Sequence, residues 1–574
     1  MLPNIFKTLA LPVTLSLALS GCATLPVQAD APLVEVQGTV MAADPRATDA
    51  GMEMLRQGGS ATDAAIAVML ALTVVEPQSS GIGGGGFMVH GEADGSVTTL
   101  DGREAAPAAA DESWFLGPDG QPQGFGNVVK TGLSIGVPGN VALAAQAHER
   151  YGKLPWAKLF EPAIALAEGF IVNPRLNASL DGSIERAGLD PAMRATFYQP
   201  DGSPMPVGTT IRRPELAETF RKLAADGPQA FYGADNAQAL AKTIAAATPG
   251  NATMTAADIT GYEPVERPAS CGTYRAYRIC TMGPPSSGIS MLAMLGQLER
   301  FDIAALGPQS VQFWHLFLES QKLAYADREL YIGDPSFVEV PAGPLIDPAY
   351  IASRSALIDP ARTLPDYPAG SPDGVSLALA DGDEPVESGT THFVAVDGSG
   401  EMVSYTSTVE GGFGSGHAFG GYHLNNELTD FSFSPQVDGR PVANRVEGGK
   451  RPRSSMTPTI VWDPEGKPFL LIGGAGGGFI PVQTARTIIG VVDFGLPLEQ
   501  AMGLPLTISF GRGLYVEEGS WLAGQVDALE ARGHANIRLG PQPFGSVGQV
   551  GAVRQGDGWI AAHDPRFAGK LDAP

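Results

Sequence analysis

The sequence is short of positive charge. Its 574 residues include 37 lysines and arginines against 61 aspartates and glutamates, which gives a formal net charge of −24 at pH 7. A protein that binds nucleic acid needs a basic face to neutralise phosphates, so this balance excludes nucleic acid as a partner. If the substrate is an anion, a specific arginine must attract it locally, because the overall field of the protein opposes it.

Metal-binding residues are also scarce and poorly spaced. The chain has 3 cysteines and 8 histidines, without an H-E-x-x-H motif or two closely spaced cysteine pairs. Zinc sites depend on such spacing, so we expect no metal. We expect no nucleotide cofactor either, because the glycine-rich stretches 81–87 and 473–479 lack the Lys-Ser/Thr of a phosphate-binding loop. Their backbone N–H groups could instead bind an oxyanion.

The apolar stretch at the N-terminus is too short to cross a bilayer, which takes about 20 residues. Lys7 precedes this stretch at residues 9–18, and Leu-Ser-Gly-Cys follows at residues 19–22. The pattern is typical of a signal peptide. Its ending resembles the lipobox of bacterial lipoproteins, which would make Cys22 the lipidated first residue of the mature chain. A plain signal peptide cut nearby is the alternative. Either way we expect an exported protein, periplasmic and anchored to the bacterial membrane if Cys22 is lipidated.

The other two cysteines, Cys271 and Cys280, lie in the segment ASCGTYRAYRIC, which predicts two short strands about a turn. An oxidising compartment would permit a disulfide between them, with two buried thiols as the alternative.

The composition predicts a globular protein with a layered α/β architecture. Hydrophobic residues make up 44% of the chain and charged residues 17%, while 73 glycines and 47 prolines indicate many turns. Residues 44–59 and 60–76 predict two helices, the second with a capping box from Ser60 and Asp63. Strands are expected at residues 86–90 and 97–100, and further helices at 141–150, 216–225, 236–246, 289–300 and 311–328.

The clearest strand signal follows a segment rich in proline, glycine and aspartate at residues 355–388. THFVAVD, a GSG turn and EMVSYTST are apolar on both faces, which predicts two central strands of a sheet covered on both sides. Thr390 begins the first strand. Threonine is common there because its β-branched side chain suits a pleated surface. Catalysis by Thr390 would require a cut after Gly389, which would create an α-amine beside the hydroxyl to act as its base.

A serine nucleophile is the alternative, because GLSIG at residues 132–136 fits the G-x-S-x-G pattern around Ser134. That motif needs a strand before the serine and a helix immediately after it. Val-Pro-Gly follows instead, and we therefore interpret the match as a coincidence in a glycine-rich chain.

Nine stretches along the chain together resemble the γ-glutamyltransferase (γ-glutamyltranspeptidase) family of N-terminal nucleophile hydrolases. They are PQSSGIGGGGFMV, LDGREAAP, GVPGNV, PPSSG, TTHFVAVD, TSTVEGGFGSG, LNNELTDFS, RPRSSMTPTIV and GGAGGGF, in this order from about residue 40 to beyond residue 480. The resemblance implies a four-layer αββα sandwich, in which two stacked antiparallel sheets lie between helical layers. It also implies a precursor that cuts itself into a large chain, 22–389, and a small chain, 390–574; the signal peptide predicted from the N-terminal residues spans 1–21.

The resemblance assigns roles to residues of these stretches. Thr390 would attack the carbonyl of Gly389 and then serve as the nucleophile, Thr408 would orient it, and Gly476 with Gly477 would form the oxyanion hole. The implied substrate-binding residues are Arg103, Ser454 and Ser455 for an α-carboxylate and Glu410, Glu427 and Asp430 for an α-ammonium. Of the histidines, His392 is interpreted as a packed strand residue.

The activity implied is transfer of a γ-glutamyl group from glutathione or related compounds to water, an amino acid or a peptide. Two alternatives remain: a glutaryl-cephalosporin acylase on the same scaffold, and an exported relative that never matures. Glu410 departs from relatives that carry asparagine there, and the segment between Asp430 and Ser454 is short for members with a full lid over the pocket.

Overall fold

The computed structural model describes residues 38–250, 253–372, 379–381, 389–509, 513–541 and 548–571. Cys22 and the expected signal peptide lie outside the described residues, as do residues 373–378 and 382–388 of the segment before Thr390. Within the described ranges, no helix combines the length and hydrophobicity that crossing a membrane requires.

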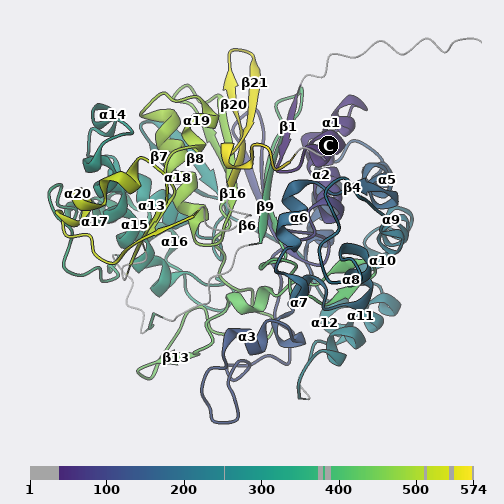
Figure 1. Ribbon diagram of the computed structural model, residues 1–574. Coiled ribbons are helices and arrows are strands. Elements are labelled where there is room, and N and C mark those ends of the chain that lie inside the picture. Colours follow the sequence, from purple (N-terminus) through teal and green to yellow (C-terminus); the bar gives the residue numbers. More distant parts are fainter. Residues whose placement is uncertain are drawn as a thin grey trace, which may run out of the picture. The chain divides into compact units, whose positions relative to one another are not determined.

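Two six-stranded antiparallel sheets form the centre of the fold (Figure 1). The first has the order β1-β9-β10-β2-β3-β6 and the second β21-β20-β16-β15-β8-β7. The strands of the first sheet are β1 (Thr39–Ala42), β2 (Gly85–Gly91), β3 (Val97–Asp101), β6 (Val265–Arg267), β9 (Thr390–Val396) and β10 (Met402–Thr408). Those of the second are β7 (Ser270–Tyr274), β8 (Tyr277–Thr281), β15 (Thr459–Trp462), β16 (Pro468–Ala475), β20 (Gly548–Gln555) and β21 (Gly558–His563).

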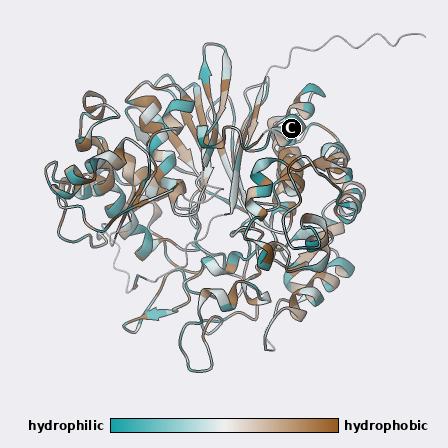
Figure 2. Ribbon diagram, in the orientation of Figure 1, coloured by the Kyte–Doolittle hydropathy of each residue, from teal (hydrophilic) through white to brown (hydrophobic). Residues whose placement is uncertain are grey.

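Helices cover the outer face of each sheet, and hydrophobic residues, brown in Figure 2, are prominent on them. The helices that share a hydrophobic core with the first sheet are α1 (Pro45–Arg56), α2 (Ala61–Val75), α4 (Asn140–Tyr151), α5 (Glu161–Glu168), α9 (Pro214–Asp226) and α11 (Ala234–Ala246). Those that share one with the second sheet are α13 (Gly288–Leu298), α15 (Val311–Tyr331), α17 (Pro348–Ala356), α18 (Phe479–Val492), α19 (Leu498–Met502) and α20 (Val526–Glu530).

Shorter elements complete the described chain. The helices are α3 (Phe125–Val128), α6 (Pro174–Leu180), α7 (Ile184–Ala187), α8 (Pro191–Phe197), α10 (Gln229–Tyr232), α12 (Ala256–Thr260), α14 (Ile303–Leu306) and α16 (Ala342–Leu345). The strands are β4 (Phe170–Ile171), β5 (Thr210–Ile211), β11 (Ala418–Phe419), β12 (Tyr422–His423), β13 (Gln436–Val437), β14 (Arg440–Pro441), β17 (Thr507–Ser509), β18 (Leu514–Glu517) and β19 (Ile537–Gly540).

The side chains of β9 show how the layers are joined. Phe393 and Ala395 belong to the core shared with α2, whereas Val394 and Val396 belong to a core that includes Leu471 of β16 in the second sheet. Alternate residues of a strand face opposite sides, so one face of β9 packs on helices and the other on a sheet. The order of layers is therefore helix, sheet, sheet, helix, and the expected αββα sandwich is confirmed.

Several local predictions are also confirmed. Ser60 caps α2 through a reciprocal capping box with Asp63. All of β9 and β10 is buried, as their apolar faces predicted. Cys271 and Cys280 lie directly opposite each other on β7 and β8 and form a disulfide.

The segment between Asp430 and Ser454 contains a small hairpin of β13 and β14. Its strands are exposed or half-buried, and the hairpin is largely hydrophilic, teal in Figure 2.

Candidate active site

The expected nucleophile lies at the start of a central strand. Thr390 and Thr408 are register partners on the antiparallel strands β9 and β10, and their hydroxyl oxygens are 3.2 Å apart. The Thr408 hydroxyl donates to the carbonyl oxygen of Gly389 at 3.1 Å. A hydroxyl has one proton, and that of Thr408 is used in the bond to Gly389. In the hydrogen bond between the two hydroxyls, Thr390 is therefore the donor and Thr408 the acceptor. The Thr408 hydroxyl thus contacts the carbonyl of the expected cleavage site and holds the Thr390 hydroxyl next to it.

The backbone around the peptide bond between Gly389 and Thr390 is tightly packed. Glu410 has a φ of 76°, an uncommon conformation for a residue other than glycine, and its N–H donates to the Thr408 hydroxyl at 2.8 Å. A Cβ atom on Gly389 would lie 2.5 Å from the carbonyl oxygen of Glu410 and 2.5 Å from the carbonyl carbon of Gly411. Since both are backbone atoms, only glycine fits before Thr390 without displacing the chain.

Arg103 is fully buried and is held from several directions. Its guanidinium donates to the carboxylates of Glu427 and Asp430, and to the carbonyl oxygens of Pro452 at 3.2 Å and Arg453 at 2.8 Å. The arginine expected to bind a carboxylate and two acids expected to bind an ammonium are therefore neighbours. A ligand carrying both charges matches this arrangement, because each end would meet an opposite charge.

The loop that carries Arg103 is anchored at its backbone. The N–H of Arg103 donates to Asp101 at 2.8 Å, and its carbonyl oxygen accepts from the Tyr262 hydroxyl at 2.7 Å. Burial alone would raise the pKa of Asp101, but the guanidinium groups of Arg451 and Arg267 hold it below its usual value. The ionised carboxylate of Asp101 thus holds the backbone of the Arg103 loop in place.

Glu104, next in the chain, is a site residue that sequence reasoning did not single out. It is buried, and neither carboxyl oxygen has a hydrogen-bond partner among the described residues. Burial raises its pKa to about 8, although Arg103 opposes the rise. At neutral pH this carboxyl group is therefore largely protonated.

The expected serine pair is held in place from the second helical layer. The carbonyl oxygen of Ser454 accepts from the N–H of Ser287 at 2.8 Å and from its hydroxyl at 2.7 Å. The hydroxyl of Ser455 accepts from Arg328 of α15 at 3.0 Å.

The expected oxyanion-hole residues connect β16 to α18. Gly476 and Gly477 have φ values of 125° and 54°, which favour glycine, and their carbonyl oxygens accept the first hydrogen bonds of α18. Their strand packs against β9, since a Cβ on Gly473 would lie 2.4 Å from the ring of His392. The loop and the start of α18 thus offer N–H groups of the kind that bind an oxyanion.

His392 itself is packed between the sheets. Its Nδ1 bonds to the Thr406 hydroxyl at 2.8 Å, and burial lowers its pKa to about 3. These contacts agree with a packing role. Ser134 is no nucleophile elbow, because it lies in a 3-10 helix (Gly132–Ser134) and its hydroxyl donates to the carbonyl oxygens of Val129 and Thr131.

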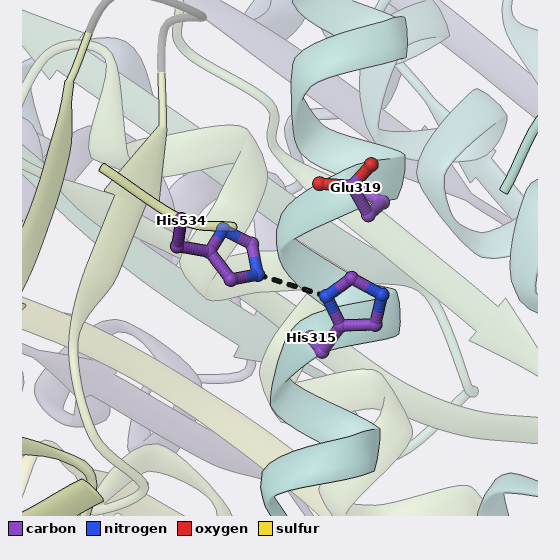
Figure 3. A group of neighbouring side chains, drawn as sticks. All are labelled: His315, Glu319 and His534. Carbon is purple, nitrogen blue, oxygen red and sulfur yellow. Dashed lines mark hydrogen bonds between the residues drawn. The ribbon is translucent and has the colours of Figure 1, made fainter. Parts of the chain in front are cut away.

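One group in the described part of the chain has the residue types of a metal site, although we expected none from the sequence. His315, Glu319 and His534 place their nitrogen and oxygen atoms within 4.8 Å of one another (Figure 3). The two histidines are 219 positions apart and share a 2.9 Å hydrogen bond, so sequence spacing could not reveal the group.

The contacts of this group fit a hydrogen-bond network better than a metal. Lys322 donates to Glu319 at 3.1 Å and lies 3.4 Å from His534, so an ammonium group already neutralises the carboxylate. Burial and the charge of Lys322 lower the pKa of His534 to about 3. The other nitrogen of His315 bonds to the carbonyl oxygen of Asp359 at 2.8 Å. We therefore assign the group a structural role.

The stacked sheets, with a threonine at the head of a central strand, define an N-terminal nucleophile hydrolase fold. The sequence profile described as gamma-glutamyltranspeptidase matches residues 47–573. The chain belongs to the gamma-glutamyltranspeptidase family.

Its similarity to known proteins extends over most of its length. It is 37% identical over 487 residues to the glutathione hydrolase proenzyme of Escherichia coli strain K12, covering 83% of this chain and 81% of that protein. It is 35% identical over 528 residues to the glutathione hydrolase proenzyme of Bacillus subtilis strain 168, covering 90% and 87%. The crystal structure of cephalosporin acylase from Bacillus halodurans matches with a TM-score of 0.79 at 25% identity, covering 96% of this chain and 98% of that one.

Proposed function

We propose that the protein is a self-processing γ-glutamyl hydrolase and acyltransferase with Thr390 as its nucleophile. The observation that carries the proposal is the hydrogen-bonded set of Thr390, Thr408 and the carbonyl of Gly389. The names of the relatives in E. coli and B. subtilis, both glutathione hydrolase proenzymes, support it.

Maturation begins when the Thr390 hydroxyl adds to the carbonyl carbon of Gly389. The C–N bond breaks, the nitrogen takes the proton to become the α-amine of Thr390, and an ester joins Gly389 to the threonine oxygen. Water then hydrolyses this ester, which leaves a carboxylate on Gly389 and a free hydroxyl on Thr390. The products are a large chain, 22–389, and a small chain, 390–574, that remain together.

The mature nucleophile then acts on a γ-glutamyl amide such as glutathione. The α-amine of Thr390 takes the hydroxyl proton as the oxygen attacks the γ-carbonyl carbon. Gly476 and Gly477 supply N–H donors for the developing oxyanion; one such donor contributes about 2.7–4 kcal/mol in other enzymes. The leaving amine departs with a proton, and water or the amino group of an amino acid or peptide attacks the γ-glutamyl ester to release Thr390. The mechanism needs no cofactor or metal.

Recognition of the γ-glutamyl group follows from its two charges. Arg103, Ser454 and Ser455 bind the α-carboxylate, and the guanidinium fork suits this planar anion. Glu410, Glu427 and Asp430 bind the α-ammonium. The contact of Arg103 with Glu427 and Asp430 supports this division, because it places both charges within reach of one ligand.

A glutaryl-cephalosporin acylase is the second candidate, favoured by the structural similarity to a cephalosporin acylase. A glutaryl group keeps the carboxylate but lacks the α-ammonium. The acidic residues beside Arg103 would then lack a cation in the substrate, which favours the glutamyl donor.

The deciding experiment is intact mass measurement of purified protein and of a Thr390→Ala variant, followed by incubation with glutathione and with a glutaryl-cephalosporin. We expect wild type to be cut between Gly389 and Thr390 and to release glutamate, while the variant stays whole and inactive. A higher kcat/KM for the glutaryl donor would favour the acylase. An uncut wild type, or a variant that still turns over, would refute Thr390 as the nucleophile.

We further propose that the protein is exported to the periplasm and anchored there through a lipid on Cys22. The lipobox-like residues 19–22 support this location, as does the disulfide between Cys271 and Cys280, which suits an oxidising compartment. Labelling of cells with a fatty-acid analogue should mark wild type but not a Cys22→Ala variant. An unlabelled wild type whose N-terminus is nevertheless trimmed would indicate a plain signal peptide.

A further inference from the structure

A buried arginine of α15 contacts the expected substrate-binding serines from the side of the helical layer. The side chain of Arg328 is only 4% exposed. Its Nη2 donates to the Ser455 hydroxyl at 3.0 Å, and its Nε donates to the Ser287 hydroxyl at 2.8 Å. Ser287 links Arg328 to Ser454, because the Ser287 hydroxyl donates to the carbonyl oxygen of Ser454 at 2.7 Å. Arg328 therefore holds the hydroxyl of Ser455 directly and the backbone carbonyl of Ser454 through Ser287.

The direction of these hydrogen bonds matters for an anion. A hydroxyl that accepts a bond from a guanidinium keeps its own proton for another acceptor. The nearby cation also polarises that hydroxyl and strengthens the bond it donates. Ser455 is thus prepared to donate to a carboxylate rather than to accept from an ammonium group.

Arg328 also belongs to a small ion-pair network. Glu329 forms ion pairs with both Arg328 and Arg453. These ion pairs hold the guanidinium of Arg328 in place beside Ser455, one of the serines expected to bind the α-carboxylate.

The position of Arg328 is itself well fixed. Its carbonyl oxygen accepts from Arg453 at 3.1 Å, and its guanidinium lies 5.6 Å from the ring centre of Tyr325, one turn earlier on α15. The Tyr325 hydroxyl donates to the carbonyl oxygen of Gly478, next to the expected oxyanion-hole glycines. One rigid helix thus touches the carboxylate-binding end and the reacting end of the site.

We propose that Arg328 is a positioning residue for recognition of the α-carboxylate: it holds the hydroxyl of Ser455 as a donor, fixes the backbone of Ser454 through Ser287, and places a guanidinium behind both serines. This inference rests on the proposed γ-glutamyl function. It predicts that loss of Arg328 weakens binding of donors that carry the carboxylate and leaves donors without it largely unaffected.

The test compares three chromogenic donors that release p-nitroaniline. The γ-glutamyl anilide carries both charges, the glutaryl anilide only the carboxylate, and the 4-aminobutanoyl anilide only the ammonium. The variants are Arg328→Met and Arg328→Lys, with Arg354→Lys as the matched control. Arg354 is equally buried at 4% exposure and also bonds to α15, through the Leu323 carbonyl oxygen at 3.0 Å, but its described contacts do not include the serines.

For Arg328→Met we expect KM to rise about tenfold to a hundredfold for the two donors with a carboxylate, the effect of losing a charge-assisted hydrogen bond. The kcat/KM of the 4-aminobutanoyl donor should change less than about threefold. Arg328→Lys keeps the charge but cannot make the hydrogen bonds to both Ser455 and Ser287. Its KM for the two donors with a carboxylate should therefore lie between those of wild type and Arg328→Met. Arg354→Lys should behave as wild type. Competitive inhibition by glutaramate, which carries only the carboxylate, and by 4-aminobutanamide, which carries only the ammonium, gives the same comparison if the third donor turns over slowly.

Equal losses on all three donors would overturn the proposal, because they would show a general structural defect. An unchanged KM for the γ-glutamyl donor in a variant that cuts itself normally would also overturn it. Failure of the proposed function is distinguishable, because wild type itself would then fail to cut at Thr390 or to turn over the γ-glutamyl donor.

Discussion

Replacement of Gly389 by alanine should slow the proposed maturation through the shape of the backbone alone. The new methyl group would lie 2.5 Å from the carbonyl oxygen of Glu410 and from the carbonyl carbon of Gly411. Normal contact between such atoms begins near 3.5 Å, so the chain at residue 389 must move by about 1 Å. The carbonyl that moves is the one that Thr390 attacks in the proposed maturation and that Thr408 contacts at 3.1 Å. A misplacement of this size costs about a hundredfold in rate.

Cell-free synthesis followed by intact mass measurement over time would give the rate at which the precursor yields the fragment 390–574. Gly412→Ala is the matched control, because a Cβ there meets nothing within 4 Å. We expect the control to cut at the wild-type rate and Gly389→Ala to cut about a hundredfold more slowly. The fraction that does cut should have normal specific activity, since Gly389 only ends the large chain after cleavage. Equal rates for Gly389→Ala and wild type would refute this steric argument.

Three further predictions concern Thr408, Glu104 and the disulfide. Thr408→Ala should slow self-cleavage about tenfold to a hundredfold, because the bond to the Gly389 carbonyl is lost, whereas Thr408→Ser should keep most of the rate; equal rates in the same mass assay would show that the hydroxyl is not used. Burial raises the pKa of Glu104 from 4.5 to about 8, so its contribution to stability is complete below pH 4.5 and is lost as pH rises through 8, by at most roughly 1.4 kcal/mol per pH unit. Urea unfolding of wild type and Glu104→Gln at pH 5 and pH 8 should show the larger decline in wild type, and parallel declines would contradict the protonated state. Serine at both Cys271 and Cys280 should lower the free energy of unfolding by about 2–3 kcal/mol, with an unchanged denaturation midpoint as the contrary result.

The sequence predicted the elements whose signals are local. The capping box of Ser60 and Asp63 marked the start of α2, and the apolar faces of residues 390–396 and 402–408 marked two central strands. The αββα order came from the family resemblance, because hydrophobic alternation shows that a strand is covered but not what covers it.

The contacts of the site were less predictable because they join distant parts of the chain. Arg103 meets Glu427 across 324 positions, and His315 meets His534 across 219. The left-handed backbone of Glu410 has no sequence signal, since glycine is the residue expected at such a φ. Arg328 has no local sequence signal either, because it lies within a helix and its contacts with Ser287 and Ser455 join distant parts of the chain.

Each sheet contains strands from both sides of the proposed cut. In the first sheet β9 and β10, which follow residue 389, pair with β1 and β2, which precede it, and in the second sheet β15 pairs with β8. After the proposed cleavage, refolding requires two chains to associate, whereas the precursor folds as one chain. The precursor can refold as one molecule at any dilution, whereas two separated chains must first meet, so recovery after denaturation becomes dependent on concentration. An enzyme matured in this way folds once, as a single chain, and at low concentration its lifetime is set by the rate at which it unfolds.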